Sequence, residues 1–346
     1  MEAKRTLKRD WSSLLPEVLN LIAKNVNEVS DFIRFRAVCK AWRSSTPITG
    51  LPPQFPWILV YDSDKPDLDC YSILSNKFYT IHSPKSFRFL RGPAEGYILT
   101  VLCNEFGDQF TSQLSFLNPL NNHEIYLPAI HSDCAYPAFY PSKNQTGEYV
   151  VCYVDGYRSG KLCFWQLGQN YWCKLNLDLG SIRDRIFYLQ NMFFIVERET
   201  GVTKAIDMGT HTLVYAIPPT EDYSIEDDQY MVEASGDIFK VIRRSPGFIS
   251  SEEFDVYQLD ANKIGSSSWV KVTSIGNRAL FTDWRCTLIL RANDFAGIKR
   301  NSIYFCAYKE DHHVDEECEV KRDGHRDWCN GTSPVHYQRT RLLVCP

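Results

Sequence analysis

The chain has 346 residues, and 44% of them are hydrophobic, a share typical of a folded globular protein and too high for a disordered one. Acidic residues outnumber basic ones and give a net charge of −4 at pH 7, so no overall positive field would attract nucleic acid. No apolar run approaches the roughly 18 residues that cross a bilayer. Composition and charge therefore argue against a nucleic-acid-binding protein and a membrane protein.

Aromatic residues make up 14% of the chain and are interspersed with 18 Gly and 17 Pro, a mixture that indicates many short strands between turns. The 12 cysteines occur singly, mostly in apolar strand-like runs, where a reduced thiol behaves as a small core residue. Residues 1–11 are polar and have no apolar core of a secretion signal. We therefore expect a reducing location, the nucleus and/or the cytoplasm.

Residues 12–44 have a helical period that the rest of the chain lacks, and it predicts two amphipathic helices. Pro16 suits the first turn of the first helix, Glu17 suits the positive end of its dipole, and Ser30 or Asp31 could cap the second. The apolar positions that carry the period are Leu15, Leu19, Ile22 and Val26, then Phe32, Phe35, Cys39 and Trp42. We predict a helical module over residues 8–46 and a Pro- and Gly-containing linker over 47–56.

So small a unit cannot bury its own apolar stripes, which must be covered by something else. The period alone favours a helical cap that packs on the rest of the chain, and it leaves docking on a partner protein open. The residue identities change this balance. The run from Leu14 to Glu17 reads Leu-Leu-Pro-Glu, and the run from Val38 to Arg43 reads Val-Cys-Lys-Ala-Trp-Arg. Together with the spacing between them, these runs closely resemble an F-box.

The resemblance implies that the module docks on the Skp-type adaptor of a cullin-based ubiquitin ligase and, through it, meets the cullin and RING subunits. Buried aromatic and aliphatic anchors on short helices suit such an interface. Residues 1–45 carry nine Lys or Arg against five Asp or Glu, which would favour an acidic partner surface. The positions that match the family's docking surface are Leu14, Pro16, Leu19, Ile22, Phe35, Val38, Cys39 and Trp42.

The rest of the chain, 57–346, contains five similar segments in which an apolar strand, a polar turn and a second strand end in an aliphatic residue. The closing aliphatic residues are Ile81, Leu127, Leu175, Ile217 and Val272, which lie 42 to 55 residues apart. A β-propeller blade of four short strands consumes about 40–50 residues, and the length predicts about six blades. A β-sandwich is the competing fold, but its hairpins keep no fixed long period. We therefore expect a mainly β protein, closed by pairing residues 57–61 with 341–345.

A second resemblance becomes specific towards the end of the chain. The run from Trp269 to Phe281 reads Trp-Val-Lys-Val-Thr-Ser-Ile-Gly-Asn-Arg-Ala-Leu-Phe, and Arg300–Phe305 follows it. These runs are similar to the signature region of the KIB-type β-propeller that follows an F-box in a large plant family. The resemblance implies a propeller over 57–346 behind the F-box.

We searched the sequence for catalytic and metal motifs and identify no catalytic residue, no cofactor site and no metal site. Gly156–Leu162 approximates a phosphate loop, but the spacing is one residue short and Leu162 replaces the Ser or Thr, so a hairpin turn is favoured. A cluster of His312, His313, Cys318, His325 and Cys329 matches no standard zinc spacing. Acidic runs over 221–228 and 315–319 favour solvated loops, with an electronegative rim for a basic substrate as the alternative.

The two resemblances together predict a non-catalytic substrate receptor of an SCF-type ubiquitin ligase, in which the propeller binds the target protein. A propeller scaffold that acts outside a ubiquitin ligase is the alternative. A propeller enzyme such as a glycosidase is disfavoured, because no paired-carboxylate or metal signature stands out.

Overall fold

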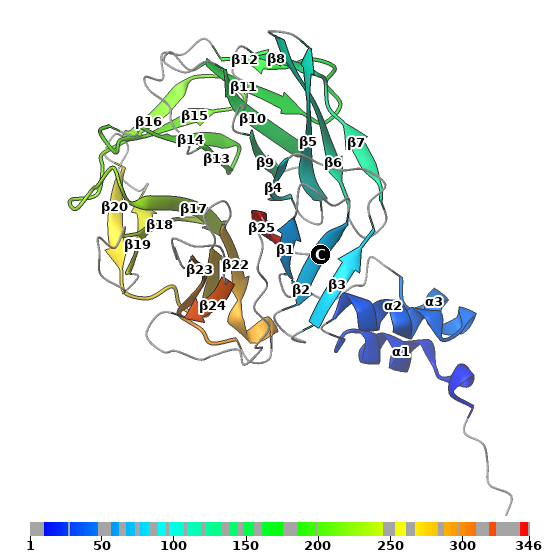
Figure 1. Ribbon diagram of the computed structural model, residues 1–346. Helices are drawn as coiled ribbons and strands as arrows, with labels where there is room; N and C mark the ends of the chain where they lie inside the picture. Colours follow the sequence, from blue (N-terminus) through cyan, green and yellow to red (C-terminus); the bar gives the residue numbers. More distant parts are fainter. Residues whose placement is uncertain are drawn as a thin grey trace, which may run out of the picture.

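In the computed structural model of the protein, the described residues are 10–26, 28–47, 57–61, 67–72, 77–82, 89–94, 97–106, 109–118, 122–132, 139–143, 148–155, 161–175, 186–197, 199–244, 253–260, 267–282, 287–295, 298–308, 318–322 and 340–344. They form a group of short helices beside a ring of β-sheets (Figure 1). The helices lie within the predicted range 8–46 and the strands within 57–346.

The N-terminal helices, which we call the helical module, are one 3₁₀ turn and three α-helices: η1 (Trp11–Ser13), α1 (Pro16–Ala23), α2 (Val29–Ala37) and α3 (Lys40–Ser45). Pro16 and Glu17 occupy the first turn of α1, as predicted. The prediction of a single second helix is wrong, because Cys39 has an extended backbone (φ −161°, ψ 172°) that separates α2 from α3. The break allows α3 to fold back, so that Trp42 meets Phe35.

The predicted cap of α2 is also wrong. The N-cap residue is Glu28, whose side chain makes no capping hydrogen bond. Ser30 and Asp31 are engaged elsewhere: the Ser30 hydroxyl is 3.2 Å from the Tyr79 hydroxyl, and Asp31 pairs with Arg34 at 2.7 Å. In the first turn, Ser30 therefore contacts β3 and Asp31 pairs within α2, and neither caps the helix end.

Six β-sheets surround a common axis as the blades of a propeller, which confirms the predicted fold (Figure 1). From the axis outward, blade 1 consists of β25 (Thr340–Val344), β1 (Trp57–Tyr61), β2 (Leu68–Ser72) and β3 (Lys77–Ile81). Blade 2 consists of β4 (Phe89–Ala94), β5 (Tyr97–Phe106), β6 (Gln109–Leu117) and β7 (Glu124–Tyr126), and β8 (Ile130–Ser132) also pairs with β6. Blade 3 consists of β9 (Phe139–Lys143), β10 (Tyr149–Asp155), β11 (Lys161–Gln166) and β12 (Cys173–Lys174). Blade 4 consists of β13 (Ile186–Leu189), β14 (Met192–Val196), β15 (Thr203–Asp207) and β16 (Leu213–Ile217); blade 5 of β17 (Asp228–Ala234), β18 (Asp237–Arg243), β19 (Phe254–Asp260) and β20 (Ser268–Val272); blade 6 of β22 (Thr287–Arg291), β21 (Arg278–Thr282), β23 (Ser302–Tyr308) and β24 (Cys318–Arg322).

The predicted repeat corresponds to the blades. Its five closing aliphatic residues lie at or directly after the outermost strands of blades 1 to 5, which are β3, β7, β12, β16 and β20. Leu127, Leu175 and Ile217 are buried although these outer strands are otherwise largely exposed. Each repeat therefore ends where the chain turns an aliphatic side chain back towards the core.

Blade 6 departs from the order of the other blades. The chain enters at β21, turns inward to β22, and then passes through the 3₁₀ turn η3 (Ala292–Asp294) to β23. As a result β23 pairs with β21 in parallel, with Leu280 opposite Ile303. The five-segment pattern did not include this blade, because its strands do not follow one another as a simple meander.

The propeller closes by pairing the two ends of its sequence. The last strand, β25, is antiparallel to β1, with Trp57 opposite Val344 and Tyr61 opposite Thr340. This is the pairing that the sequence predicted, and it gives blade 1 its innermost strand (Figure 1). An edge of β1 that would otherwise be open is thereby covered.

The core lies in layers between neighbouring blades. For example, Phe116 of blade 2 packs with Trp165 of blade 3, and Phe239 of blade 5 packs in a cluster with Leu280 of blade 6. Because both faces of each blade meet a neighbour, central strands such as β14 and β18 are buried on both faces, whereas an outer strand such as β3 is mostly exposed.

Five cysteines in the described part of the chain are free thiols, and Cys70, Cys152 and Cys163 among them are buried. Burial raises the pKa of Cys70 to about 12 and raises that of Cys152 as well. These thiols act as small core residues, as predicted. Among the described residues, no helix is both long and apolar enough to cross a membrane.

Candidate functional site: the helical module and its surface

The helical module is joined to the propeller by a buried contact at the start of α2. Val29 is buried in the same cluster as Trp57 and Leu68 of blade 1. Beside it, the Ser72 hydroxyl on β2 donates a 2.6 Å hydrogen bond to Oε1 of Glu28, and both residues are buried. The Ser30 contact with Tyr79 on β3 lies next to this pair. Three consecutive residues therefore fix the orientation of α2 against blade 1.

The module also has an interior of its own. Leu19 and Ala23 on α1 and Phe32 on α2 are buried. The Trp42 indole N–H donates a 2.9 Å hydrogen bond to the carbonyl oxygen of Trp11. This bond ties α3 to η1, and the Trp42 ring lies 4.4 Å, centroid to centroid, from that of Phe35.

The eight residues that the F-box resemblance placed at the docking surface differ in exposure. Pro16, Ile22 and Val38 are exposed, and Leu14, Phe35, Cys39 and Trp42 are half-buried. Leu19 is fully buried at 0% exposure. The structure brings Phe35 and Trp42 into direct contact. For all eight residues, a role in binding an adaptor remains a prediction.

Sequence reasoning missed several exposed apolar side chains of the module. They are Trp11, Leu15, Val18, Leu21 and Ile33, and with Ile22 and Val38 they make seven large hydrophobic residues on the surface of η1, α1 and α2 and the residues that cap them. We call these seven residues the apolar surface. The sequence of α1 did indicate a partner surface. Apolar residues occur on nearly all sides of this helix, and a helix of this kind is normally covered by protein on all sides. Solvent exposure of so many large side chains in one small unit makes the module a candidate interaction site.

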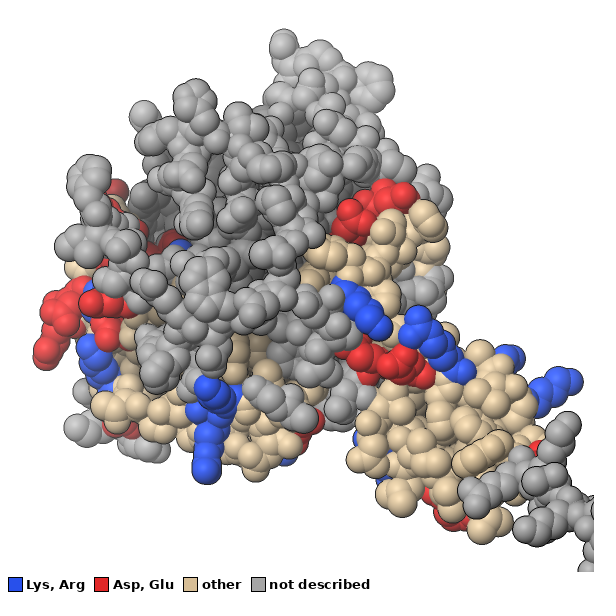
Figure 2. Space-filling model, turned by 60° about the horizontal axis from the view of Figure 1, so that its bottom comes forward, with Lys and Arg blue, Asp and Glu red and all other residues tan. Residues whose placement is uncertain are grey.

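Uncharged residues dominate this part of the molecule. Figure 2 shows the module as a broad tan area with basic and acidic side chains at its margin. The exposed ion pair of Arg34 and Asp31, 2.7 Å apart, lies on α2. An area with few charges and with charge at its edge is compatible with the core and rim of a protein–protein interface.

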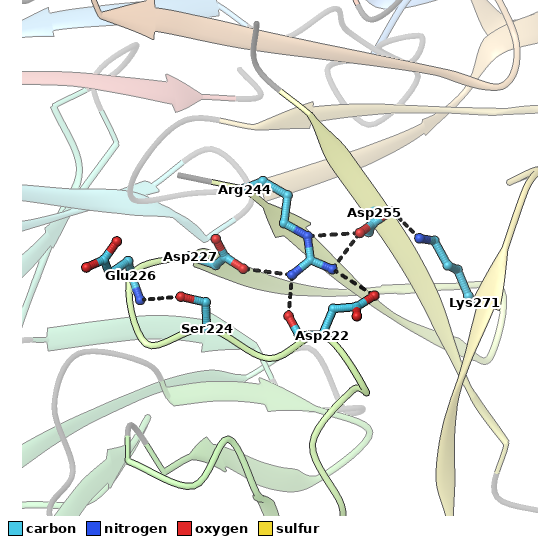
Figure 3. Close-up of polar contacts among 7 residues, drawn as sticks. All are labelled: Asp222, Ser224, Glu226, Asp227, Arg244, Asp255 and Lys271. Carbon is cyan, nitrogen blue, oxygen red and sulfur yellow. Dashed lines mark hydrogen bonds and ion pairs between the residues drawn. The ribbon is translucent and has the colours of Figure 1, made fainter. Parts of the chain in front are cut away.

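The acidic loop before β17 is not a free electronegative rim. The guanidinium of Arg244, which follows β18, bonds Asp227 at 2.8 Å, Asp255 at 2.6 Å and the carbonyl oxygen of Asp222 at 2.5 Å (Figure 3). Lys271 bonds the other oxygen of Asp255 at 2.7 Å. Asp222 and Asp227 thus serve a contact inside blade 5, which closes the loop against β19, and the loop is not simply solvated.

The remaining sequence candidates lie mostly outside the described residues. Strands β10 and β11 flank the phosphate-loop-like segment and are antiparallel, with Asp155 opposite Lys161, which is the geometry of a hairpin. Of the His and Cys cluster, only Cys318 falls in a described element, at the start of β24. Across the described ranges, no three His, Cys, Asp or Glu side chains gather in a way that could hold a metal ion.

Comparison with known proteins places the chain in a family. The KIB1-4 beta-propeller family profile matches residues 70–330. The chain is 24% identical over 311 residues to the F-box/kelch-repeat protein At1g57790 of Arabidopsis thaliana, a match that covers 86% of this chain and 83% of that protein. It is 23% identical over 360 residues to the F-box protein SKIP23 of the same plant, with 86% and 83% covered.

Among solved structures, TolB from Acinetobacter baumannii aligns with 83% of this chain and 66% of its own, at 13% identity and a TM-score of 0.45. The family match spans five of the six blades in full or in large part, and the F-box/kelch-repeat relative covers 86% of the chain. The chain therefore belongs to the KIB1-4 beta-propeller family, and over more than four fifths of its length it is similar to plant F-box proteins.

Proposed function

We propose that this chain is the substrate-receptor subunit of an SCF-type ubiquitin ligase. The helical module docks on a Skp-type adaptor, which connects it to the cullin and RING subunits, and the propeller binds the target protein. The observation that carries the proposal is the apolar surface, seven large exposed hydrophobic residues on a module whose α2 is locked to blade 1. The similarity to F-box proteins supports it.

Catalysis in such a complex is positioning, and the chain itself makes and breaks no bond. A target held on the propeller is kept at high effective concentration near the ubiquitin-charged enzyme. The buried contact of Glu28, Val29 and Ser30 with blade 1 supports this role, because a fixed angle between module and propeller limits where the target can lie. The free thiols suit a reducing nucleus or cytoplasm.

Adaptor capture by the full-length protein tests the proposal. We expect Ile22→Glu combined with Val38→Glu to abolish retention of a Skp-type adaptor, since both side chains are exposed, at 41% and 57%, and a carboxylate would be buried without a partner. Trp42 is a poor choice for this test, because its indole bonds Trp11 and its loss would disturb the fold of the module.

The matched control is Leu213→Glu with Val214→Glu on β16, where exposed fractions of 50% and 44% are similar but the site is on the outer strand of blade 4. The control should retain the adaptor as the wild type does, and both doubles should keep the wild-type melting temperature. Equal retention by the two doubles would refute docking through this surface. No retention by the wild type, with a target still bound, would favour a scaffold outside a ubiquitin ligase.

A further inference from the structure

An open pocket of about 430 Å³, lined by both polar and apolar side chains, lies between blades 5 and 6. Its walls come from the turn between β17 and β18, from β19, and from the connection that leads into β21. The polar side chains that line it include Ser235, Gln258, Ser274, Asn277, Arg278 and Arg291. Its volume lies within the range of small-ligand sites.

Two arginines stand side by side in this pocket. Arg278 begins β21 and Arg291 ends β22, and the two residues are directly opposite in the antiparallel register. Directly opposite residues project from the same face of a sheet, and like charges there repel each other. A pair of this kind costs stability in the empty protein, and an anion placed between the two guanidinium groups would remove that cost.

Arg278 is held in place by its surroundings. It donates hydrogen bonds to Asp237 Oδ2 at 3.1 Å and to the carbonyl oxygen of Ala234 at 3.3 Å, and its guanidinium lies 5.2 Å from the centre of the Phe239 ring. Arg291 is exposed, and among the described residues it has no hydrogen bond or ion pair. One arginine is therefore preorganised and the other is available for a ligand.

The pocket contrasts in charge with the rest of the propeller. Outside residues 1–45, acidic residues exceed basic ones by eight, whereas the described residues that line the pocket include two arginines; the nearest acid is Asp237, which pairs with Arg278 at 3.1 Å and accepts a hydrogen bond from Gln258 at 3.0 Å. The Ser235 hydroxyl and the Asn277 amide add uncharged groups that can donate hydrogen bonds. Because Asp237 balances Arg278, the positive charge left for a ligand is that of Arg291, and this charge beside neutral donors, on an otherwise acidic body, favours an anionic group.

We propose that this pocket binds an anionic oxygen group, a carboxylate or a phosphate, carried by a side chain of the target protein. Binding of the anion depends on Arg278 and Arg291, and its assignment to the target rests on the proposed function. The arginine forks offer the paired donors that carboxylate and phosphate oxygens accept. Because Arg278 already donates a hydrogen bond to Asp237, Arg291 supplies the larger share of the hydrogen bonds to a bound anion.

Calorimetric titration of the full-length chain, without an adaptor, tests the pocket directly. The probes are N-acetyl-phosphoserine amide and N-acetyl-glutamate amide, with N-acetyl-glutamine amide as the neutral analogue. We expect the two anions to bind, the glutamine analogue to bind at least about tenfold more weakly, and Arg291→Gln to weaken anion binding by at least about tenfold. Tighter binding of phosphoserine would identify a phosphorylated target, and equal binding an acidic one.

Arg34→Gln on α2 is the matched control, because it removes one exposed arginine from a different surface, and it should bind the anions as the wild type does. Without ligand, Arg291→Gln should melt at or above the wild-type temperature, since it relieves repulsion, whereas loss of a structural arginine would lower it. Wild-type affinity in Arg291→Gln, a lowered melting temperature, or equal affinity for the glutamine analogue would overturn the proposal. Adaptor capture is measured separately, so failure of the pocket leaves the test of the helical module unaffected.

Discussion

Arg244 joins three acidic residues of blade 5, and its ion pairs should make the stability of the propeller depend on pH. Burial acts to raise the pKa of Asp255, but hydrogen bonds from Lys271 and Arg244 outweigh it and hold the pKa below its ordinary value. A carboxylate of this kind stabilises the fold above its ordinary pKa of about 3.9, and the contribution is lost as pH falls through the lower folded-state pKa.

We therefore expect Asp255→Asn to lower the free energy of unfolding by about 1–2 kcal/mol at pH 7, because the hydrogen bonds to a charged acceptor are lost. The difference from the wild type should shrink as pH falls below about 4, where Asp255 becomes protonated in both folded and unfolded protein. Urea midpoints measured across this pH range check it. The exposed Asp31→Asn change should have little effect at either pH, since its pair with Arg34 is solvated. A pH-independent loss in Asp255→Asn would contradict the electrostatic account.

At the scale of residues, the sequence predicted types of environment better than individual partners. The buried thiol of Cys152 followed from its apolar neighbours in the chain. The pairing of Asp222 and Asp227 with Arg244 did not, because strand pairing brings these residues together from distant positions in the chain. The half-buried state of Trp42 was missed for the same reason, since its partner Trp11 is 31 residues away.

Helix α2 and strand β2 meet through few side chains, so this junction can be weakened without damage to the propeller. Val29→Ala removes apolar atoms from a buried cluster and should cost about 1–2.5 kcal/mol of local stability. We expect faster amide hydrogen exchange across residues 28–37, and unchanged exchange in blades 3 to 5. Amide hydrogens exchange when their own cooperative unit opens, so the exchange rate of each region reports the stability of that region. Mass spectrometry of the exchanged peptides therefore measures α2 and blades 3 to 5 separately.

Ile33→Ala is the control on the same helix, because Ile33 is 55% exposed and its side chain packs little against the chain. It should leave the exchange of α2 as in the wild type. If Val29→Ala also left exchange unchanged, the junction would not be what holds the module to blade 1.

At the scale of elements, periodicity located two strands in each of blades 1 to 5 and the first helix. It failed where the direction of the chain changed within a continuous apolar pattern. Phe32, Phe35, Cys39 and Trp42 keep a helical spacing although the backbone is extended at Cys39. Similarly, the run that begins at Arg278 reads as an ordinary strand, and nothing in it specifies that β22 lies inside β21.

The ring as a whole was predictable because local sequence patterns indicate both its repeat length and the strands that close it. Five outer strands end at or directly before the predicted aliphatic residues, and the predicted first and last strands pair. The candidate site was predictable only in part: the motif located the helical module, but the exposure of Leu15 and Leu21, at 64% and 65%, depends on how the three helices pack. The arginine pocket was not predictable, because it forms only where blades 5 and 6 meet.

We expect closure by β25 to stabilise the whole ring, so that its removal lowers the stability of the other blades as well as that of blade 1. A chain that ends after residue 339 loses every partner that β25 supplies to β1, from Trp57 to Tyr61, and leaves β1 as an open edge. Because β25 also contacts β4 of blade 2, the loss breaks the ring of inner strands at the point where its two ends meet. We expect the melting temperature to fall by at least about 5 °C and the protein to aggregate on heating. A chain that lacks only residues 345–346 keeps the strand and should melt as the wild type does. Differential scanning calorimetry with light scattering distinguishes these outcomes, and an unchanged melting temperature in the longer deletion would mean that blades 2 to 6 hold the ring without it.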